Sequence, residues 1–329
     1  MKLITNISIL KNFITARLFN LRYPIAVGWA ITYKCNYRCK YCSRWNISTY
    51  EVSTEEARKI IDKLWRLGLR RINFTGGEPL IRKDIASLIT YAKNKNIYVC
   101  LNSNGSLVPQ YIHSLKSIDL LILSIEGPEH INDLIRQGGS FKDVIEAVKA
   151  AKTENIRVRF SSTLNKYNLE YVEELIQLAN KFSISVTFQP VELYLLGTDI
   201  TNSLLPTKDA YCQALKKIIR YKHNPKYRNN IGNSLNGLNY LLQWPNLKPL
   251  DCAFGKIIFR ITPDGKMYPC SQNTSEKYSI DLTKVDEQGI KKNLKSYPNF
   301  RCSCGCSNRV EANLVWNLKL SSIYEVFKL

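Results

Sequence analysis

The sequence predicts an α/β fold, a partial (β/α)6 barrel whose six parallel strands are joined by helices. Short apolar stretches rich in β-branched residues recur between residues 27 and 189, and amphipathic helical stretches separate them. Crossovers of this kind join parallel strands with right-handed connections. Cysteine-rich and polar motifs follow directly after several of these strands, at the end where parallel barrels carry their active sites.

Capping and breaking residues mark the boundaries of the expected elements. The helix after the first strand begins at a capping box over 53–56 and ends at Gly68. Pro109 begins a short helix, and Ser140 is expected to cap the helix over 140–155. The expected strands are 27–32, 71–75, 97–102, 119–125, 156–163 and 184–189, and two further helices occupy 83–96 and 171–182.

The remainder of the chain is less regular. Residues 197–206 and 224–234 are expected to be loops on either side of a basic helix over 207–223. Two short strands flank the turn Thr262-Pro-Asp-Gly265, which predicts a β-hairpin over 256–270. We therefore expect an N-terminal helix within 1–24, the α/β core over 25–195, a connecting or substrate region over 196–250, and a small C-terminal unit over 251–329.

The N-terminal segment has an apolar stripe at helical spacing and contains no acidic residue. Lys11 and Arg17 lie off the stripe. Two interpretations stay open, because such an amphipathic helix can pack across the barrel or lie on a membrane surface. The stripe consists of Leu3, Ile7, Leu10, Ile14, Leu18 and Leu21.

Composition narrows the compartment and the class of partner. The 329 residues carry a formal net charge of +20, which can attract nucleic acid, anionic lipid or an acidic peptide. The basic and aromatic run 220–228 is typical of an RNA binder or of a solvated loop. No apolar run is long enough to span a membrane, and the N-terminus lacks a secretory pattern. We expect a cytoplasmic protein, or one held at a membrane surface by its N-terminal helix.

The chain has ten cysteines, and in a cytoplasmic protein they indicate metal ligands or catalytic groups rather than disulfides. Cys100 and Cys212 stand alone and are expected to be buried thiols. Cys35, Cys39 and Cys42 follow the first strand with the spacing CxxxCxxC. Three thiolates can hold three irons of a [4Fe–4S] cube and leave the fourth iron free. Zinc, the alternative, would lack its fourth ligand.

Together with the GGEP segment after the second strand, this loop resembles the radical S-adenosylmethionine (radical SAM) enzymes over residues 25–190. The resemblance implies a partial TIM-like barrel whose three-cysteine loop binds a catalytic [4Fe–4S] cluster. It implies that the free iron binds S-adenosylmethionine (SAM) and that reductive cleavage gives a 5′-deoxyadenosyl radical, which takes hydrogen from the substrate. The residues it assigns to SAM binding are Tyr41, Gly76, Gly77, Glu78, Pro79, Asn102, Ser124 and Arg136.

The segment 124–141 is similar to one found in the peptide-modifying and sulfatase-maturing branch of these enzymes. In that branch Arg136 would pair with the SAM carboxylate, and Ser124 would contact the ribose or the carboxylate. The chain departs from the pattern by having Glu126 where the branch has Asp.

The segment 251–270, with the first two of a second group of cysteines, resembles the start of the auxiliary-cluster extensions called SPASM and Twitch, whereas the later CxCxC run departs from their usual CxxC endings. Five cysteines suffice for one auxiliary [4Fe–4S] cluster, so a Twitch-like unit of hairpin plus helix is expected, with a zinc site as the alternative. If 302–306 is extended, neighbouring cysteines would stand about 6.6 Å apart on one face, and one of them would be spare. The group consists of Cys252, Cys270, Cys302, Cys304 and Cys306.

The sequence therefore predicts a radical SAM oxidoreductase or maturase. A peptide or protein substrate is favoured by the resemblance over 124–141, and a small molecule (a sugar, alcohol or lipid) is the alternative. The resemblance also implies an electron donor such as flavodoxin or ferredoxin. The hypothesis from a different class is a basic zinc-binding or RNA-binding protein without catalysis, and nucleic acid is not the partner that we expect.

Overall fold

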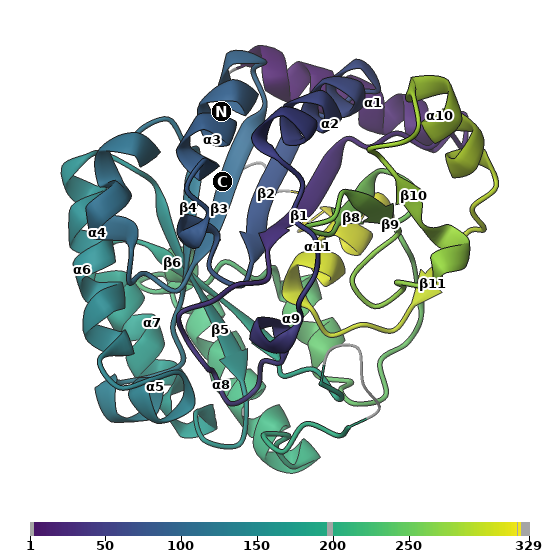
Figure 1. Cartoon of the computed structure of the whole chain (residues 1–329). Helices are drawn as coiled ribbons and strands as arrows, with labels where there is room; N and C mark the ends of the chain where they lie inside the picture. Colours follow the sequence, from purple (N-terminus) through teal and green to yellow (C-terminus); the bar gives the residue numbers. More distant parts are fainter. Residues whose placement is uncertain (1–2, 196–199, 321, 324–329) are drawn as a thin grey trace.

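In the computed structural model, which describes every residue except 1–2, 196–199, 321 and 324–329, six strands form the parallel centre of one sheet (Figure 1). Each strand pairs in parallel with its predecessor, as the sequence predicts. The carboxyl ends of the six strands therefore meet at one edge of the sheet. The strands are β1 (Ala26–Thr32), β2 (Arg71–Gly76), β3 (Tyr98–Ser103), β4 (Leu120–Ser124), β5 (Val158–Leu164) and β6 (Ser185–Pro190).

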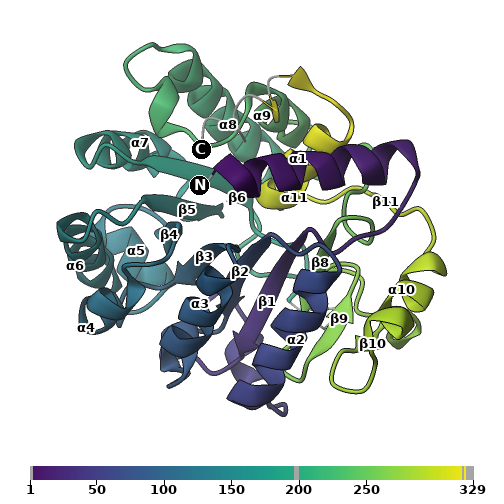
Figure 2. The same cartoon turned by 90° about the horizontal axis from the view of Figure 1, so that it is seen from above.

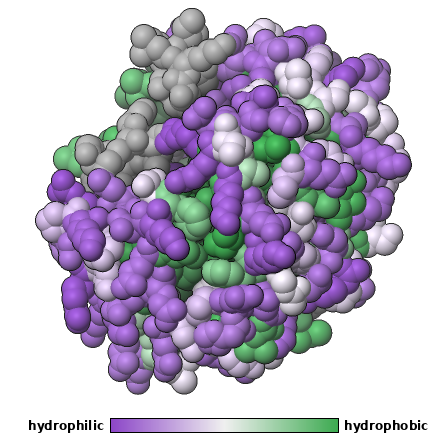
Figure 3. Space-filling model, turned by 90° about the vertical axis from the view of Figure 1, so that its left-hand side faces the viewer, coloured by the Kyte–Doolittle hydropathy of each residue, from purple (hydrophilic) through white to green (hydrophobic). Residues whose placement is uncertain are grey.

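Helices follow the strands and cover the convex side of the sheet (Figures 1 and 2). On the face of the molecule where α4 and α6 lie, hydrophilic side chains predominate and hydrophobic ones show between them (Figure 3). The covering helices are α2 (Thr54–Arg66), α3 (Ile85–Asn94), α4 (Val108–Tyr111), α5 (Glu129–Ile135), α6 (Ser140–Thr153), α7 (Val172–Lys181) and α8 (Lys208–His223).

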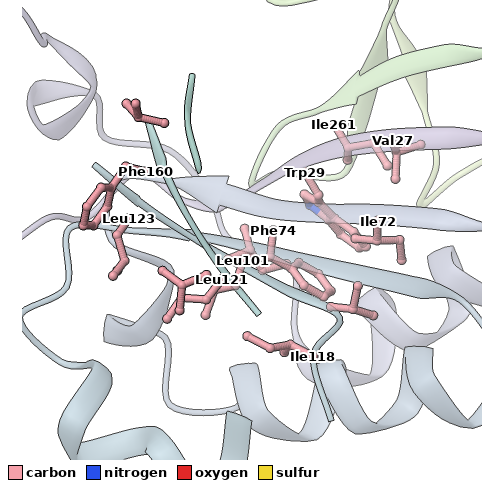
Figure 4. Packing of buried hydrophobic residues seen from close by; sticks show 14 of the residues in the cluster. Val27, Trp29, Ile72, Phe74, Leu101, Ile118, Leu121, Leu123, Phe160 and Ile261 are labelled. Carbon is pink, nitrogen blue, oxygen red and sulfur yellow. The ribbon is translucent and has the colours of Figure 1, made fainter. Parts of the chain in front are cut away.

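The core lies between the sheet and these helices (Figure 4). Val27 and Trp29 of β1 pack beside Ile72 and Phe74 of β2, and all four are buried. Because successive side chains of a strand point to opposite faces, the residues between them face the concave side of the sheet. The concave-face residues Asn73 and Thr75 of β2 are only half-buried, and polar residues at the carboxyl ends of β2, β3 and β4 line a cavity on this side.

The helix ends bear out one capping prediction and correct another. Gly68 follows α2 with a φ of 109°, and α2 begins at the predicted capping box. Ser140, predicted as a cap, is instead the first residue of α6, and Gly139 with a φ of 81° precedes it as the cap. The Ser140 hydroxyl accepts a hydrogen bond from Asn132 and donates one to Asp133. It therefore connects α6 to α5 and does not cap its own helix.

The predicted hairpin is present, and it extends the central sheet. Its strands β8 (Ile258–Ile261) and β9 (Lys266–Tyr268) are antiparallel, and β8 pairs in parallel with β1. The sheet therefore has nine strands in the order β10-β9-β8-β1-β2-β3-β4-β5-β6, with β10 at Ile280–Asp281. The boundary expected near residue 251 is accordingly not a break in the sheet. The other late elements are α9 (Leu235–Leu241), β7 (Leu250–Asp251), α10 (Glu287–Lys295), β11 (Arg301–Cys302) and α11 (Ser307–Trp316).

The N-terminal helix α1 (Leu3–Leu18) crosses the molecule beside α11 (Figure 2). Its contacts come from Ile9, Phe13 and Ala16, and the Phe13 ring lies 5.4 Å from the ring of Trp316. From Leu10 onward the predicted stripe does not make this contact, since its residues are exposed. The side chains of Leu3 and Ile7, which begin the stripe, lie outside the described part of the chain. The apolar pattern predicted the helix but not the face that it buries. Among the residues described, no helix is long and apolar enough to cross a membrane.

Candidate functional site

The first three cysteines lie on the loop that follows β1. Cys39 is buried, and Cys35 and Cys42 are half-buried. Backbone hydrogen bonds of 2.9 Å from Gly77 to Thr32 and from Glu78 to Lys34 join the start of this loop to the end of β2. The Lys40 backbone donates to Ile135. The loop is thus held from both sides before any ligand is bound.

A cavity of about 150 Å³ lies at the carboxyl ends of β2, β3 and β4 beside this loop. Most of the residues predicted to bind the cluster and SAM line it together. They are Cys35, Cys39, Tyr41, Cys42, Gly76, Gly77, Asn102, Ser124 and Arg136. The lining also includes Tyr37, Arg44, Trp45 and Thr75, which the sequence analysis did not single out.

The glycines of the GGEP segment are required by the approach of two backbones. Gly76 has a φ of 136°, and a Cβ built on it would lie 1.9 Å from the carbonyl oxygen of Thr32. A Cβ on Gly77 would lie 2.2 Å from the carbonyl oxygen of Lys34. A side chain at either position would push the cysteine loop away from β2. The glycines therefore set the position of the loop as well as lining the cavity.

Glu78 is fully buried next to the cavity, and Pro79 is buried after it. Its carboxylate accepts hydrogen bonds from the backbone of Leu80 and Asn104 and from the Ser103 hydroxyl, at 2.7 to 3.2 Å. Burial raises the pKa of Glu78 to about 7, although these hydrogen bonds oppose the shift. In this arrangement Glu78 joins the segment after β2 to the segment after β3.

Arg136 and Glu126 form a buried ion pair at the edge of the cavity. The Arg136 guanidinium donates to Glu126 at 3.0 Å and to the Tyr41 hydroxyl at 2.7 Å, and the Tyr41 hydroxyl donates to Glu126. Although burial alone would lower it, the neighbouring Tyr41, Cys39 and Glu126 raise the pKa of Arg136. The Arg136 Nε is buried without a hydrogen-bond partner. Arg136 therefore stays charged and keeps donor capacity for a ligand.

Burial also affects the thiols of the loop. It raises the pKa of Cys39 to about 11, while Arg136 opposes the shift. A thiol must lose its proton to bind iron. Cluster binding at this loop is therefore expected to release protons, and the guanidinium close by favours the charged thiolate.

The late cysteines come from separate segments. Cys252 is buried after β7, Cys302 lies in β11, and their sulfurs are 3.4 Å apart. The Cys304 sulfur is 3.8 Å from that of Cys302, and Cys306 is the N-cap of α11. The sulfurs of Cys302 and Cys304 therefore lie closer together than the spacing of about 6.6 Å predicted for neighbouring cysteines of an extended stretch.

Two residues of α11 support the late group. The Asn313 amide donates to the Cys302 sulfur at 3.2 Å, and its oxygen accepts from the Ala253 backbone. Arg309 is buried and pairs with Glu192 at 2.9 Å. Although burial alone would lower it, Cys306, Cys304 and Glu192 raise the pKa of Arg309. The zinc alternative needs four ligands around one ion. Within the described ranges, no three or more His, Cys, Asp or Glu are arranged to hold a single ion.

Comparison with known proteins supports the fold and points to a family. Residues 29–179, a little under half of the chain, match the family model described as the radical SAM superfamily. This part of the chain is similar to the radical SAM superfamily. The chain is 29% identical over 255 residues to the mycofactocin maturase MftC of Mycobacterium tuberculosis, an alignment covering 75% of this chain and 64% of MftC. The chain thus spans less than two thirds of that relative.

Two solved structures share the fold. Streptococcus suis SuiB bound to its precursor peptide SuiA aligns with a TM-score of 0.67 at 14% identity, over 95% of this chain and 77% of SuiB. The protein anSMEcpe with bound AdoMet (SAM) aligns with a TM-score of 0.67 at 18% identity, over 84% of this chain and 81% of that protein. The predicted α/β fold is confirmed.

The residues around the cavity fit the two groups that the resemblance implies, a [4Fe–4S] cluster and SAM. Three thiols on one loop suit a cube with one free iron. Orphaned polar atoms, the Asn102 Oδ1 and the Arg136 Nε, are buried beside them. No local sequence pattern marks Arg309 or Asn313, because each contacts a distant segment, Arg309 through Glu192 and Asn313 through the Ala253 backbone. Arg260 of β8 has one signal in the sequence, because it places a charge in the otherwise apolar stretch 257–261.

Proposed function

We propose that this protein is a radical SAM enzyme, which cleaves SAM reductively at the loop of Cys35, Cys39 and Cys42 and modifies a peptide or protein substrate. The observation that carries the proposal is the cavity that these cysteines line together with Gly76, Gly77 and Arg136. When bound, the cluster and SAM supply a 5′-deoxyadenosyl radical that takes hydrogen from the substrate. The residues of the chain bind, orient and shield these groups.

Each residue around the cavity has a task in this proposal. Arg136 is proposed to bind the SAM carboxylate through its remaining donors, while Glu126 holds the guanidinium in place. Asn102 and Ser124 are proposed to contact the ribose, and Tyr41 the adenine side of SAM. Gly76 and Gly77 are proposed to receive the methionine amino group through their backbone. Glu78, whose carboxylate accepts three hydrogen bonds from the chain, is proposed to fix this segment.

We propose further that residues 251–329 form a Twitch-like unit that holds one auxiliary [4Fe–4S] cluster. The cysteines available are Cys252, Cys270, Cys302, Cys304 and Cys306. The support is the proximity of the sulfurs of Cys252, Cys302 and Cys304, together with the amide of Asn313 on Cys302. Four of the five thiols complete a cube.

The peptide substrate is favoured by the likeness to MftC, which is named a maturase, and by SuiB, whose structure contains a precursor peptide. A reducing partner such as flavodoxin or ferredoxin is part of the proposal, because the cleavage needs an electron. The exposed side chains of Leu10, Ile14 and Leu18 on α1 support the additional proposal of a peripheral contact with a membrane.

The experiment is anaerobic reconstitution with iron and sulfide, followed by reduction with dithionite in the presence of SAM. The proposal predicts 5′-deoxyadenosine and methionine in equal amounts, measured by liquid chromatography and mass spectrometry. The ultraviolet–visible spectrum should show the broad iron–sulfur absorbance that a zinc protein lacks. Absence of 5′-deoxyadenosine above the enzyme-free background, in protein with full iron content, would refute SAM cleavage.

A further inference from the structure

Arg260 is a charged residue in a strand that is otherwise apolar. It lies in β8, where it pairs with Gly28 of β1 on one side and with Tyr268 of β9 on the other. A Cβ built on Gly28 would lie 3.8 Å from the Arg260 Nη1. The guanidinium therefore lies over Gly28 on the concave face of the sheet, where a larger neighbour would occupy the space.

The charge of Arg260 has no acidic partner. Its Nη2 is buried without a hydrogen-bond partner. Neither Arg260 nor Arg44 forms an ion pair with any carboxylate that the structure describes, whereas Arg136 pairs with Glu126 and Arg309 with Glu192. Arg136 and Arg309 are thus compensated by an acid, whereas Arg260 and Arg44 are not compensated by one in the described part of the chain.

The electrostatic environment of Arg260 agrees with this contrast. Burial, together with the charges of Arg44 and Arg309, lowers the pKa of Arg260 to about 9, and Tyr33 opposes the shift. Arg260 is half-buried as a residue, and an unpaired cation that is partly removed from water destabilises the protein that holds it. A bound anion would remove both the burial penalty and the repulsion between the arginines.

We propose that Arg260 and Arg44 form a binding site for a carboxylate group of the substrate. The proposal rests on the proposed function, because a peptide carries carboxylates at its C-terminus and on acidic side chains. A guanidinium matches a carboxylate with two parallel hydrogen bonds. The orphaned Nη2 of Arg260 supplies a donor that no group of the described chain uses.

The position of this site explains how a substrate would be held between the two cysteine groups. Arg44 lines the cavity of the first group, and Arg309 lies among the late cysteines. Arg260 is close enough to both to be affected by their charges. A carboxylate on Arg260 would anchor one end of the substrate and leave its neighbouring atoms facing the cavity.

The test is a calorimetric titration of the reconstituted protein with SAM and without reductant, so that no turnover is needed. The probes are acetyl-Ala-Ala with a free carboxylate, its C-terminal amide, and acetyl-Ala-Glu-amide. Wild type should bind at least one carboxylate probe about tenfold more tightly than the amide. The probe that is preferred identifies the source as a C-terminus or an acidic side chain.

Arg260→Gln should abolish this preference, and Arg260→Lys should retain part of it. Arg66→Gln, which removes an exposed arginine of α2, should leave it unchanged. Because the unpaired charge is removed, Arg260→Gln should unfold at a temperature no lower than wild type. Should Arg260→Gln not fold, Arg44→Gln must weaken the preference instead.

Equal affinity of wild type for the carboxylate and the amide would overturn the inference, and so would a preference that survives Arg260→Gln. A melting temperature several degrees below wild type for Arg260→Gln would show a structural role and also overturn it. Failure of the proposed function is a separate result. A protein that prefers the carboxylate but makes no 5′-deoxyadenosine would leave this site intact and refute SAM cleavage.

Discussion

The first cysteine group lies on a single loop after β1, whereas the late group is assembled from segments around residues 252, 270 and 302–306. The first loop is fixed by backbone hydrogen bonds to the end of β2 and to α5. The late group depends on the pairing of β7 with β11 and on the amide of Asn313.

Because of this difference, the geometry of the two sites depends on different parts of the chain. The geometry of the first site is encoded in eight consecutive residues and in the glycines that let two backbones meet. The geometry of the second exists only when distant segments have folded together. We therefore expect that each site can lose its cluster while the other site keeps its own.

The largest effect is expected from replacing Cys35, Cys39 and Cys42 together with Ala. Formation of 5′-deoxyadenosine should fall to the background, and iron content should fall by about four per chain, because one cube is lost. The iron of the late group should stay bound. Cleavage of SAM above background in this variant would contradict the assignment of the loop.

The next effect concerns the late group, tested in protein that lacks the first three cysteines. Cys252→Ala or Cys270→Ala should lose about four irons per chain, since each lies on a segment with no substitute thiol. Among Cys302, Cys304 and Cys306, at least one single Ala variant should keep them. If all five variants lost their iron, the proposal of one four-ligand cluster would fail.

A change in stability with pH is expected at Glu78, which ties the first site together. Because its folded-state pKa is raised to about 7 from 4.5, its contribution to stability is full below about pH 4.5 and is lost as the pH rises to about 7. The loss amounts to at most about 3 kcal/mol. Chemical denaturation should show that the free energy of unfolding of wild type falls across this pH range relative to that of Glu78→Gln. The iron content of the late group should not change. Parallel pH profiles for the two proteins would contradict the shift.

The smallest effect is expected at Arg136. Arg136→Ala should weaken SAM binding by roughly 1–3 kcal/mol, because it removes a charged hydrogen-bond donor from a buried site. Equilibrium dialysis with labelled SAM would measure this, with Arg66→Ala as the exposed control. Iron content should stay at the wild-type level in both. An affinity equal to that of wild type would mean that Arg136 serves only to hold Glu126 and Tyr41.

The sequence predicted what depends on local pattern. The six parallel strands, the end of α2 at Gly68 and the first cysteine loop follow from periodicity, caps and spacing. It did not predict the pairing of β8 with β1, because strand pairing between residues more than 200 positions apart depends on tertiary packing. The face of α1 that is buried could not be predicted for the same reason, since it depends on packing against α11.

The sequence also left out residues that act through distant contacts. Glu126 stood in the sequence as a departure from a family pattern, and the structure shows it as the partner of both Arg136 and Tyr41. Asn313 lies on α11, and its side-chain amide donates a hydrogen bond to the sulfur of Cys302 on β11. Such roles depend on side-chain reach between elements, which no local pattern records.

The central claim is that SAM binds to the cluster of the first loop and not to the auxiliary cluster. Electron paramagnetic resonance of the reduced protein, recorded with and without SAM, tests it most directly. SAM should change the cluster spectrum of wild type, and it should leave the spectrum of the variant without Cys35, Cys39 and Cys42 unchanged. A wild-type spectrum that ignores SAM, or a variant spectrum that responds to it, would contradict the claim.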